Sequence, residues 1–261
     1  MSMNVSVLFD VLEERLRSLG ESQNAPFPLR VIHFLRMVWN ICKSFFDNKP
    51  AENSISECER IFVPQECTWD CGIACCNMIL KWNRVKYTPA FDRHIVSSDQ
   101  KPLWTIELFC LLKEVGLDVS MYTICEGVNP QHKRLNWYAN SSSDYEVAAT
   151  QERFKQARSN NWKVYEEELS LEMLQSIVTQ ESSVAVVLVD SHTLHQIEST
   201  DYSGHYIVVM DYDDKTDEFT CLNPSRCPGT MFVSSYVLER ARCHDGTDQD
   251  VLICHRKPAA R

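Results

Sequence analysis

The sequence is poor in glycine, with seven glycines among 261 residues, against a usual share of about 7%. No two of them are close enough to form a G-x-G unit. A Walker loop and a dinucleotide-binding fingerprint are therefore both excluded, because each needs clustered glycines to bring backbone amides against phosphate. If this chain handles a nucleotide, it does so without a glycine-rich phosphate cradle.

Long apolar runs and an excess of positive charge are also missing. A membrane-spanning helix needs ~18 or more uncharged apolar residues, and the nearest candidate, residues 29–46, carries Arg30, Arg36 and Lys43. The formal net charge of -10 argues against a nucleic-acid partner, which would require a basic surface. The first residues lack the basic start and apolar core of a signal peptide. We therefore expect a cytoplasmic or nuclear protein without a transmembrane segment.

Cysteine is abundant, but its spacing is not that of a metal motif. Four of the 12 cysteines lie in "QECTWDCGIACC", residues 65–76, and no C-x2-C occurs anywhere. A composite zinc site from the cysteines at 67, 71 and 75 and the histidines of "HTLH" is an alternative, although structural zinc sites favour C-x2-C pairs. In a reducing compartment a disulfide framework is not expected. We therefore expect no bound metal and one reactive thiol among inert neighbours.

Cys71 is the best candidate for that thiol. It stands where a helical pattern begins, and the positive end of a helix dipole and its free amides lower a thiol pKa. Cys75 and Cys76 follow one turn later, where burial would make them core residues. Gln65, six residues before Cys71, could donate its side-chain amide to the carbonyl oxygen that a thiolate attacks.

A thiol nucleophile needs a base and a group that orients the base. His205 opens an apolar strand and Asn223 closes the next one, and pairing the two centres the intervening turn on Asp214 in "DYDDKTDE". Turn composition places the reversal at the same point. This register predicts that His205 and Asn223 are direct cross-strand neighbours, about 5 Å apart at Cβ. Asn223 would then fix the tautomer of the His205 ring.

The chain divides into an N-terminal extension, 1–60, and a main domain, 61–261. Amphipathic helices are predicted at about 5–18 and 29–46, the second either packed on the main domain or bound to a membrane surface or partner. Residues 47–60 have the composition of a linker. In the main domain, helices predominate early and strands late, with a buried strand at 182–190. This order predicts an α+β fold with N-terminal helices packed on a largely antiparallel sheet.

The order Gln-x5-Cys-Gly, a distant His at a strand start, and an Asn after the next strand resembles the papain-like cysteine peptidases. Within that group the sequence motifs are similar to those of bacteriocin-processing peptidases, and more similar to those of the eukaryotic guanylyl-cyclase-domain-containing protein family. The second resemblance covers roughly residues 61–255, through "WDCGIAC", "LWTIEL", "YTICEGVNP", "GHYIVVMDYD" and "GTDQDVLI" in that order. It implies a papain-like fold, while the family name implies conversion of GTP to cyclic GMP. The residues at 73, 74 and 76 depart from papain's own motif.

Three functions follow as hypotheses. The first is a thiol hydrolase acting on a peptide or amide bond, without a cofactor, with Cys71 as nucleophile, His205 as base, Asn223 as orienter and Gln65 as oxyanion donor. The second is a guanylyl cyclase using Mg²⁺ or Mn²⁺, which needs carboxylates such as those of the acidic turn at 211–214. The third is a pseudoenzyme whose pocket binds a peptide or protein partner.

Overall fold

The computed structural model describes residues 52–85, 101–135 and 144–256. These residues belong to one compact unit that starts at Glu52. The helices expected at 5–18 and 29–46 lie outside the described residues.

The chain from residue 52 is helical where a linker was expected. Helix α3, Glu52–Ile61, occupies most of the segment 47–60. Cys58 and Ile61 of α3 are fully buried in the core. The linker prediction was therefore wrong for these residues, because it rested on polar composition and ignored the two apolar positions three residues apart that anchor the helix.

A seven-stranded sheet forms the centre of the fold, in the order β2-β1-β7-β3-β4-β5-β6. Only β1 and β2, at one edge, run parallel, and every other neighbouring pair is antiparallel. The strands are β1 (Asp118–Thr123), β2 (Val164–Glu166), β3 (Ser183–Asp190), β4 (Gly204–Asp213), β5 (Glu218–Leu222), β6 (Thr230–Ser234) and β7 (Val251–His255). The α+β class and the largely antiparallel sheet are confirmed.

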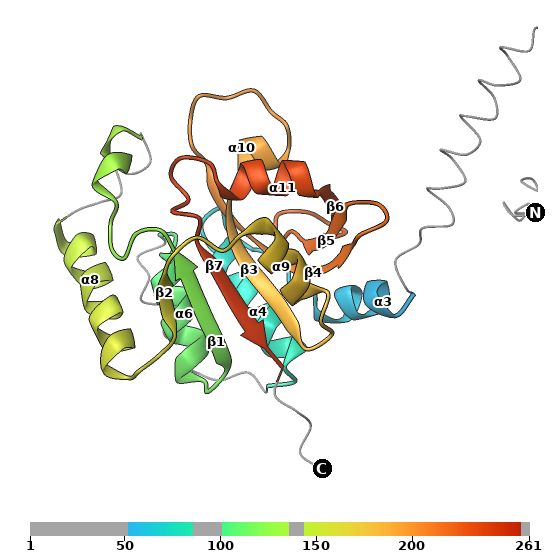
Figure 1. The fold of residues 1–261 in the computed structure, drawn as a ribbon, viewed down its shortest axis with the longest axis horizontal. Helices are drawn as coiled ribbons and strands as arrows, with labels where there is room; N and C mark the ends of the chain where they lie inside the picture. Colours follow the sequence, from blue (N-terminus) through green and yellow to red (C-terminus); the bar gives the residue numbers. More distant parts are fainter. Residues whose placement is uncertain (1–51, 86–100, 136–143, 257–261) are drawn as a thin grey trace, which may run out of the picture. The chain divides into compact units, whose positions relative to one another are not determined.

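Helices cover both faces of the sheet (Figure 1). One face contacts α3, α4 (Cys71–Trp82), α6 (Thr105–Glu114) and α8 (Asp144–Ser159). The other contacts α9 (Leu171–Val178) and α11 (Ser235–Arg242), with the short α10 (Ser191–Leu194) beside them. A 3-10 turn, η1 (Pro130–Arg134), follows β1. Strand β3 is buried at every residue, as its unbroken apolar run predicted, because helices lie on both of its faces.

The ends of two helices show how local sequence sets the elements. Ser170 precedes α9 and its hydroxyl accepts the Met173 N–H at 3.2 Å. At α6 the N-cap is Trp104, and the Glu107 carboxylate accepts its N–H at 2.8 Å. Thr105 is thereby free to turn its hydroxyl toward the sheet.

Two general expectations can be compared with the described residues. No helix in the described ranges is long and apolar enough to cross a membrane. All of the cysteines in those ranges are free thiols.

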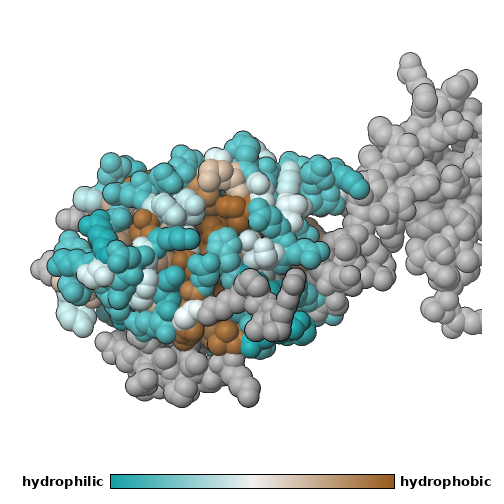
Figure 2. Space-filling model, turned by 60° about the horizontal axis from the view of Figure 1, so that its bottom comes forward, coloured by the Kyte–Doolittle hydropathy of each residue, from teal (hydrophilic) through white to brown (hydrophobic). Residues whose placement is uncertain are grey.

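The face in Figure 2 is polar over most of its area, with apolar groups exposed between the polar ones near its middle.

Candidate functional site

Cys71 is the first residue of α4, and the loop before it is held by Asp70. The Asp70 carboxylate accepts the backbone N–H groups of Glu66 and Cys67, at 3.1 and 3.0 Å, and makes no cap bond to the helix itself. The chain thus turns tightly into α4 with Cys71 at its start. The side chain of Cys67 is exposed, whereas Cys75 and Cys76 are fully buried, as the sequence predicted.

Helix α4 lies close to strand β4 because Gly72 has no side chain. A Cβ at this position would come within 2.7 Å of a Leu108 methyl carbon and 3.1 Å of the Tyr206 ring. The close approach brings the Cys71 sulfur to the backbone amide of Tyr206, the strand residue that follows His205. Cys71 and His205, which are 134 positions apart in the chain, therefore belong to one site.

Burial raises the pKa of the Cys71 thiol, and the backbone amides of Tyr206 and Gly72 only partly oppose it. The residue is 6% exposed. The lowered pKa expected at a helix start was therefore wrong for the resting protein, since desolvation of the thiolate outweighs the helix end. Burial likewise lowers the pKa of His205, and the hydrogen bond that the ring donates to Asn223 raises it. The resting site thus holds a neutral thiol and a neutral imidazole.

His205 and Asn223 form a buried hydrogen bond, with Nε2 of the ring 2.9 Å from Oδ1 of the amide. Ser225 fixes the orientation of this amide, because its backbone N–H and its hydroxyl both donate to Oδ1, at 3.0 and 2.7 Å. An atom that accepts a backbone N–H must be the amide oxygen. The facing nitrogen, Nε2, therefore carries the proton, and Nδ1 of His205 is left as the basic nitrogen.

The strand register that produces this contact differs from the predicted one. Val208 pairs with Leu222, with a bulge between Val209 and Asp211, so Asn223 lies two residues along from the position directly opposite His205. The contact is diagonal, and it forms because Asn223 stands just beyond the end of β5. The pair was predicted correctly, but the direct cross-strand pairing was wrong.

Gln65 lies beside the same loop. Its backbone N–H donates to the carbonyl of Pro224 at 3.0 Å, next to Asn223. Its side-chain nitrogen donates to the Cys67 carbonyl at 2.7 Å, within the loop that leads to α4. The described structure therefore brings all four predicted residues to one region, and no hydrogen bond within it joins the Cys71 sulfur to the His205 ring.

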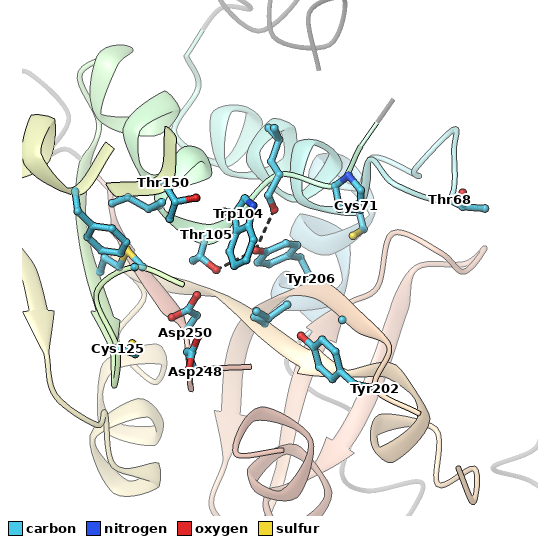
Figure 3. Close-up of a pocket in the computed structure, with 18 residues that line it drawn as sticks. Thr68, Cys71, Trp104, Thr105, Cys125, Thr150, Tyr202, Tyr206, Asp248 and Asp250 are labelled. Atoms are coloured by element: carbon cyan, nitrogen blue, oxygen red, sulfur yellow. Dashed lines mark hydrogen bonds between the residues drawn. The ribbon is translucent and has the colours of Figure 1, made fainter. Parts of the chain in front are cut away.

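A cavity that is open to solvent begins at Cys71 and runs past Tyr206 (Figure 3). The Tyr206 hydroxyl is 2.9 Å from Thr105 Oγ1 and donates to the Leu103 carbonyl at 3.3 Å. Most of the wall is apolar, with the side chains of Trp104, Ile106, Met121, Phe154 and Leu188. Cavities with apolar walls and a few polar groups are typical ligand sites.

The far end of the cavity holds two carboxyl groups, Asp248 and Asp250, which the sequence analysis did not single out. Asp248 accepts the Asn129 side-chain amide at 2.7 Å and faces His132 at 3.6 Å. Asp250 is 9% exposed and its Oδ1 has no hydrogen-bond partner. Burial raises the pKa of Asp250 to about 7, helped by the neighbouring Asp248. The signal was present in "GTDQD", but only the fold shows that this turn reaches the cavity.

The other candidate groups lie elsewhere. Of the acidic residues expected in a turn at 211–214, Asp211 and Asp213 belong to the end of β4, and only Asp214 lies in the turn that joins β4 to β5. None of the three lines the cavity. His192 bonds the Asp201 carbonyl at 2.9 Å, and His195 is near enough to His205 to help lower its pKa. In the described part of the chain, the one group of three metal-ligand side chains is Glu168, Glu239 and Cys243, away from the cysteine cluster.

Fold and site together define an α+β protein in which a buried thiol, an imidazole and an amide meet where a helix starts and a strand ends. The chain belongs to the guanylylate cyclase family, whose model matches residues 61–254. A curated relative, "Guanylyl cyclase 1" from Arabidopsis thaliana, is 28% identical over 204 residues, which cover 73% of each chain. The resemblance to the guanylyl-cyclase-domain-containing family is thereby confirmed.

Proposed function

We propose that this protein is a papain-like thiol hydrolase or transferase that acts on a peptide or amide bond. The observation that carries the proposal is the oriented His205–Asn223 pair, which leaves Nδ1 of His205 basic. Tyr206, the next residue in the strand, lines the same cavity as Cys71. A base whose tautomer is fixed by a buried amide is what a cysteine nucleophile requires.

The chemistry follows from the neutral resting state. As the Cys71 sulfur attacks the carbonyl carbon, its proton passes to Nδ1 of His205, and the carbonyl electrons move onto oxygen. We assign the backbone N–H of Cys71 and the second hydrogen of the Gln65 amide, whose first is donated to the Cys67 carbonyl, as the donors for that oxygen. The imidazolium then protonates the leaving amine, and the C–N bond breaks to give a thioester. Water or an acceptor amine cleaves the thioester and returns the proton to Cys71 through His205.

A peptide-derived acyloxymethyl ketone, which alkylates catalytic thiols, tests this proposal. We expect Cys71 to be modified faster than the exposed Cys67, followed by tandem mass spectrometry of the digested protein. His205→Ala should slow the Cys71 reaction about 100-fold or more, the usual range for loss of a general base. Cys67→Ala is the matched control and should leave the Cys71 rate unchanged. Equal labelling of all accessible thiols, independent of His205, would overturn the hydrolase proposal.

A second candidate is a guanylyl cyclase, and family membership together with the relative's name favours it. Cyclisation of GTP needs a divalent cation to neutralise the triphosphate and activate the 3′-hydroxyl. Asp250 fits this requirement best, since its Oδ1 is a buried, unpartnered oxygen donor of the kind Mg²⁺ prefers. Both oxygens of Asp248 already face protein groups, and no lysine or arginine is among the described residues that line the cavity.

Purified full-length protein, GTP and Mg²⁺ or Mn²⁺ provide the test of the cyclase. Cyclic GMP, measured by mass spectrometry, should form with the wild type and with Cys71→Ala, and Asp250→Asn should abolish it. Product at the level of a heat-denatured control in both metals would exclude the cyclase. The two candidates are thus separated by Cys71, which only the hydrolase needs.

A further inference from the structure

The charge of the cavity is unbalanced. Its described lining includes two acidic side chains, Asp248 and Asp250, and no basic one. One oxygen of Asp248 accepts a hydrogen bond from Asn129, and the other faces His132. Asp250 is different, because Oδ1 is buried, has no partner and belongs to a residue that faces the cavity (Figure 3). A buried carboxyl oxygen without a partner is costly, so a ligand that supplies a donor there would bind favourably.

The backbone around this carboxyl is unusual as well. Asp248 and Gln249 both have positive φ angles, 48° and 53°, which are rare for residues other than glycine. The turn is tied down by the Asp250 N–H bond to the Thr247 carbonyl and by the Leu188 N–H bond to the Asp250 carbonyl, both 3.1 Å. The main chain of Asp250 is therefore held in a fixed place.

Tyr206 connects this end of the cavity to the reactive thiol. Its backbone amide is near enough to Cys71 to lower the pKa of the thiol, and its hydroxyl bonds Thr105. The hydroxyls of Thr105 and Thr123 in turn lie near the Asp250 carboxyl and lower its pKa. Tyr206 and Thr105 thus lie between Cys71 and Asp250 along the cavity (Figure 3). Between them the walls are apolar, formed by Ile106, Leu188 and their neighbours.

We propose that the Asp250 end of the cavity is a specificity subsite for a basic side chain, arginine or lysine, of the peptide or protein that Cys71 attacks. Such side chains place an aliphatic stem along apolar walls and a charged head against a carboxylate. This proposal rests on the hydrolase function proposed above. It names the class of substrate that the site selects.

Two probes that differ in one atom test the subsite. We would compare acyloxymethyl ketones of the same short peptide carrying arginine or citrulline, its neutral isostere. The arginine probe should modify Cys71 at least about tenfold faster, because only the guanidinium carries a positive charge that can pair with the Asp250 carboxylate. Asp250→Asn should remove the preference, so that the two probes react with Cys71 at equal rates. Asp214→Asn, in the exposed hairpin turn outside the cavity, is the matched control and should preserve the preference.

The outcomes separate the subsite from the function. Equal rates for both probes, with labelling still dependent on His205, would overturn the subsite and leave the hydrolase intact. If neither probe labels Cys71, the hydrolase fails, and the subsite is tested by binding alone. In that case acetyl-arginine amide should shift NMR signals of the cavity in Cys71→Ala protein, and acetyl-citrulline amide should not. Equal shifts, or shifts that survive Asp250→Asn, would overturn the subsite.

Discussion

Asn223 accepts three hydrogen bonds on one oxygen, and His205 supplies one of them, at 2.9 Å. The other two come from Ser225, which belongs to the same loop. The loop thus orients the Asn223 amide, and the amide in turn orients the His205 ring. Substitution of Asn223 should therefore change the His205 base directly, whereas substitution of Ser225 should change only the bonds that orient the amide.

Removing Asn223 should change the titration of His205. In Asn223→Ala the ring loses its Nε2–H acceptor, so the pKa of His205 should fall further below its usual value. We would follow the ring protons by NMR against pH, in a Cys71→Ala background that prevents oxidation of the site. Ser225→Ala is the matched control, because its backbone N–H still orients the amide. An unchanged His205 titration in Asn223→Ala would contradict the assigned hydrogen bond.

Adding a methyl group at Gly72 should separate the thiol from the strand. Alanine favours a helix over glycine by up to about 1 kcal/mol, but the new Cβ would meet Leu108 at 2.7 Å. Leu108 is fully buried, so we expect a net loss of about 1–2 kcal/mol in the free energy of unfolding. The Cys71 alkylation rate should fall as well.

Urea denaturation measures the stability of Gly72→Ala, and the double variant with Leu108→Val serves as its control. The shorter side chain should accommodate the methyl group, so the combined loss should be smaller than the sum of the single losses. Simple additivity would show that Leu108 is not what limits the approach of α4 to β4.

The stability of the protein should fall as the pH rises from about 4 to about 7. Burial raises the pKa of Asp250 from 3.8 to about 7. Between these values the folded state keeps a proton that the unfolded state has lost, so unfolding becomes easier with increasing pH. The full effect is at most on the order of 4 kcal/mol and is complete above pH 7.

Asp250→Asn removes this dependence. We expect it to be more stable than the wild type at pH 8 and close to it at pH 4, by urea denaturation at fixed ionic strength. Asp214→Asn, an exposed substitution of the same kind, controls for the change in net charge. A constant difference between Asp250→Asn and the wild type at all pH values would show that Asp250 stays ionised in the folded protein.

Arg256 should anchor α3 to the main body of the fold. Its guanidinium lies 4.3 Å from the centroid of the Trp82 ring and 2.7 Å from the Glu57 carboxylate. Arg256→Ala should cost about 1–2 kcal/mol, more than a surface ion pair alone, because the stacking on Trp82 is also lost. Hydrogen exchange of the α3 amides should increase with it. Arg256→Lys keeps the charge and should recover only part of the loss, so full recovery would exclude a role for stacking.

Local patterns predicted most of the elements of the main domain. The apolar helix from Cys71 and the buried strand β3 both lie where their periodicity placed them, because side-chain spacing along one segment decides which face is buried. The linker prediction failed at α3, where a helix forms because two buried residues anchor it despite a polar composition. Strand β6 and η1 were not predicted, since short segments carry too few residues to show a period.

The sequence by itself predicted that Cys71, His205, Asn223 and Gln65 belong to one site, because a thiol, a base, an orienting amide and an oxyanion donor are the groups that a thiol hydrolase needs. Only the tertiary structure decided the rest: the diagonal contact of His205 with Asn223, the raised pKa of Cys71, and the arrival of Asp250 in the same cavity. The register between strands, the desolvation of the Cys71 thiol and the proximity of Asp250 to the cavity are set by segments that are far apart in the chain. No local pattern carries them, because each depends on what packs against a residue rather than on what surrounds it in sequence.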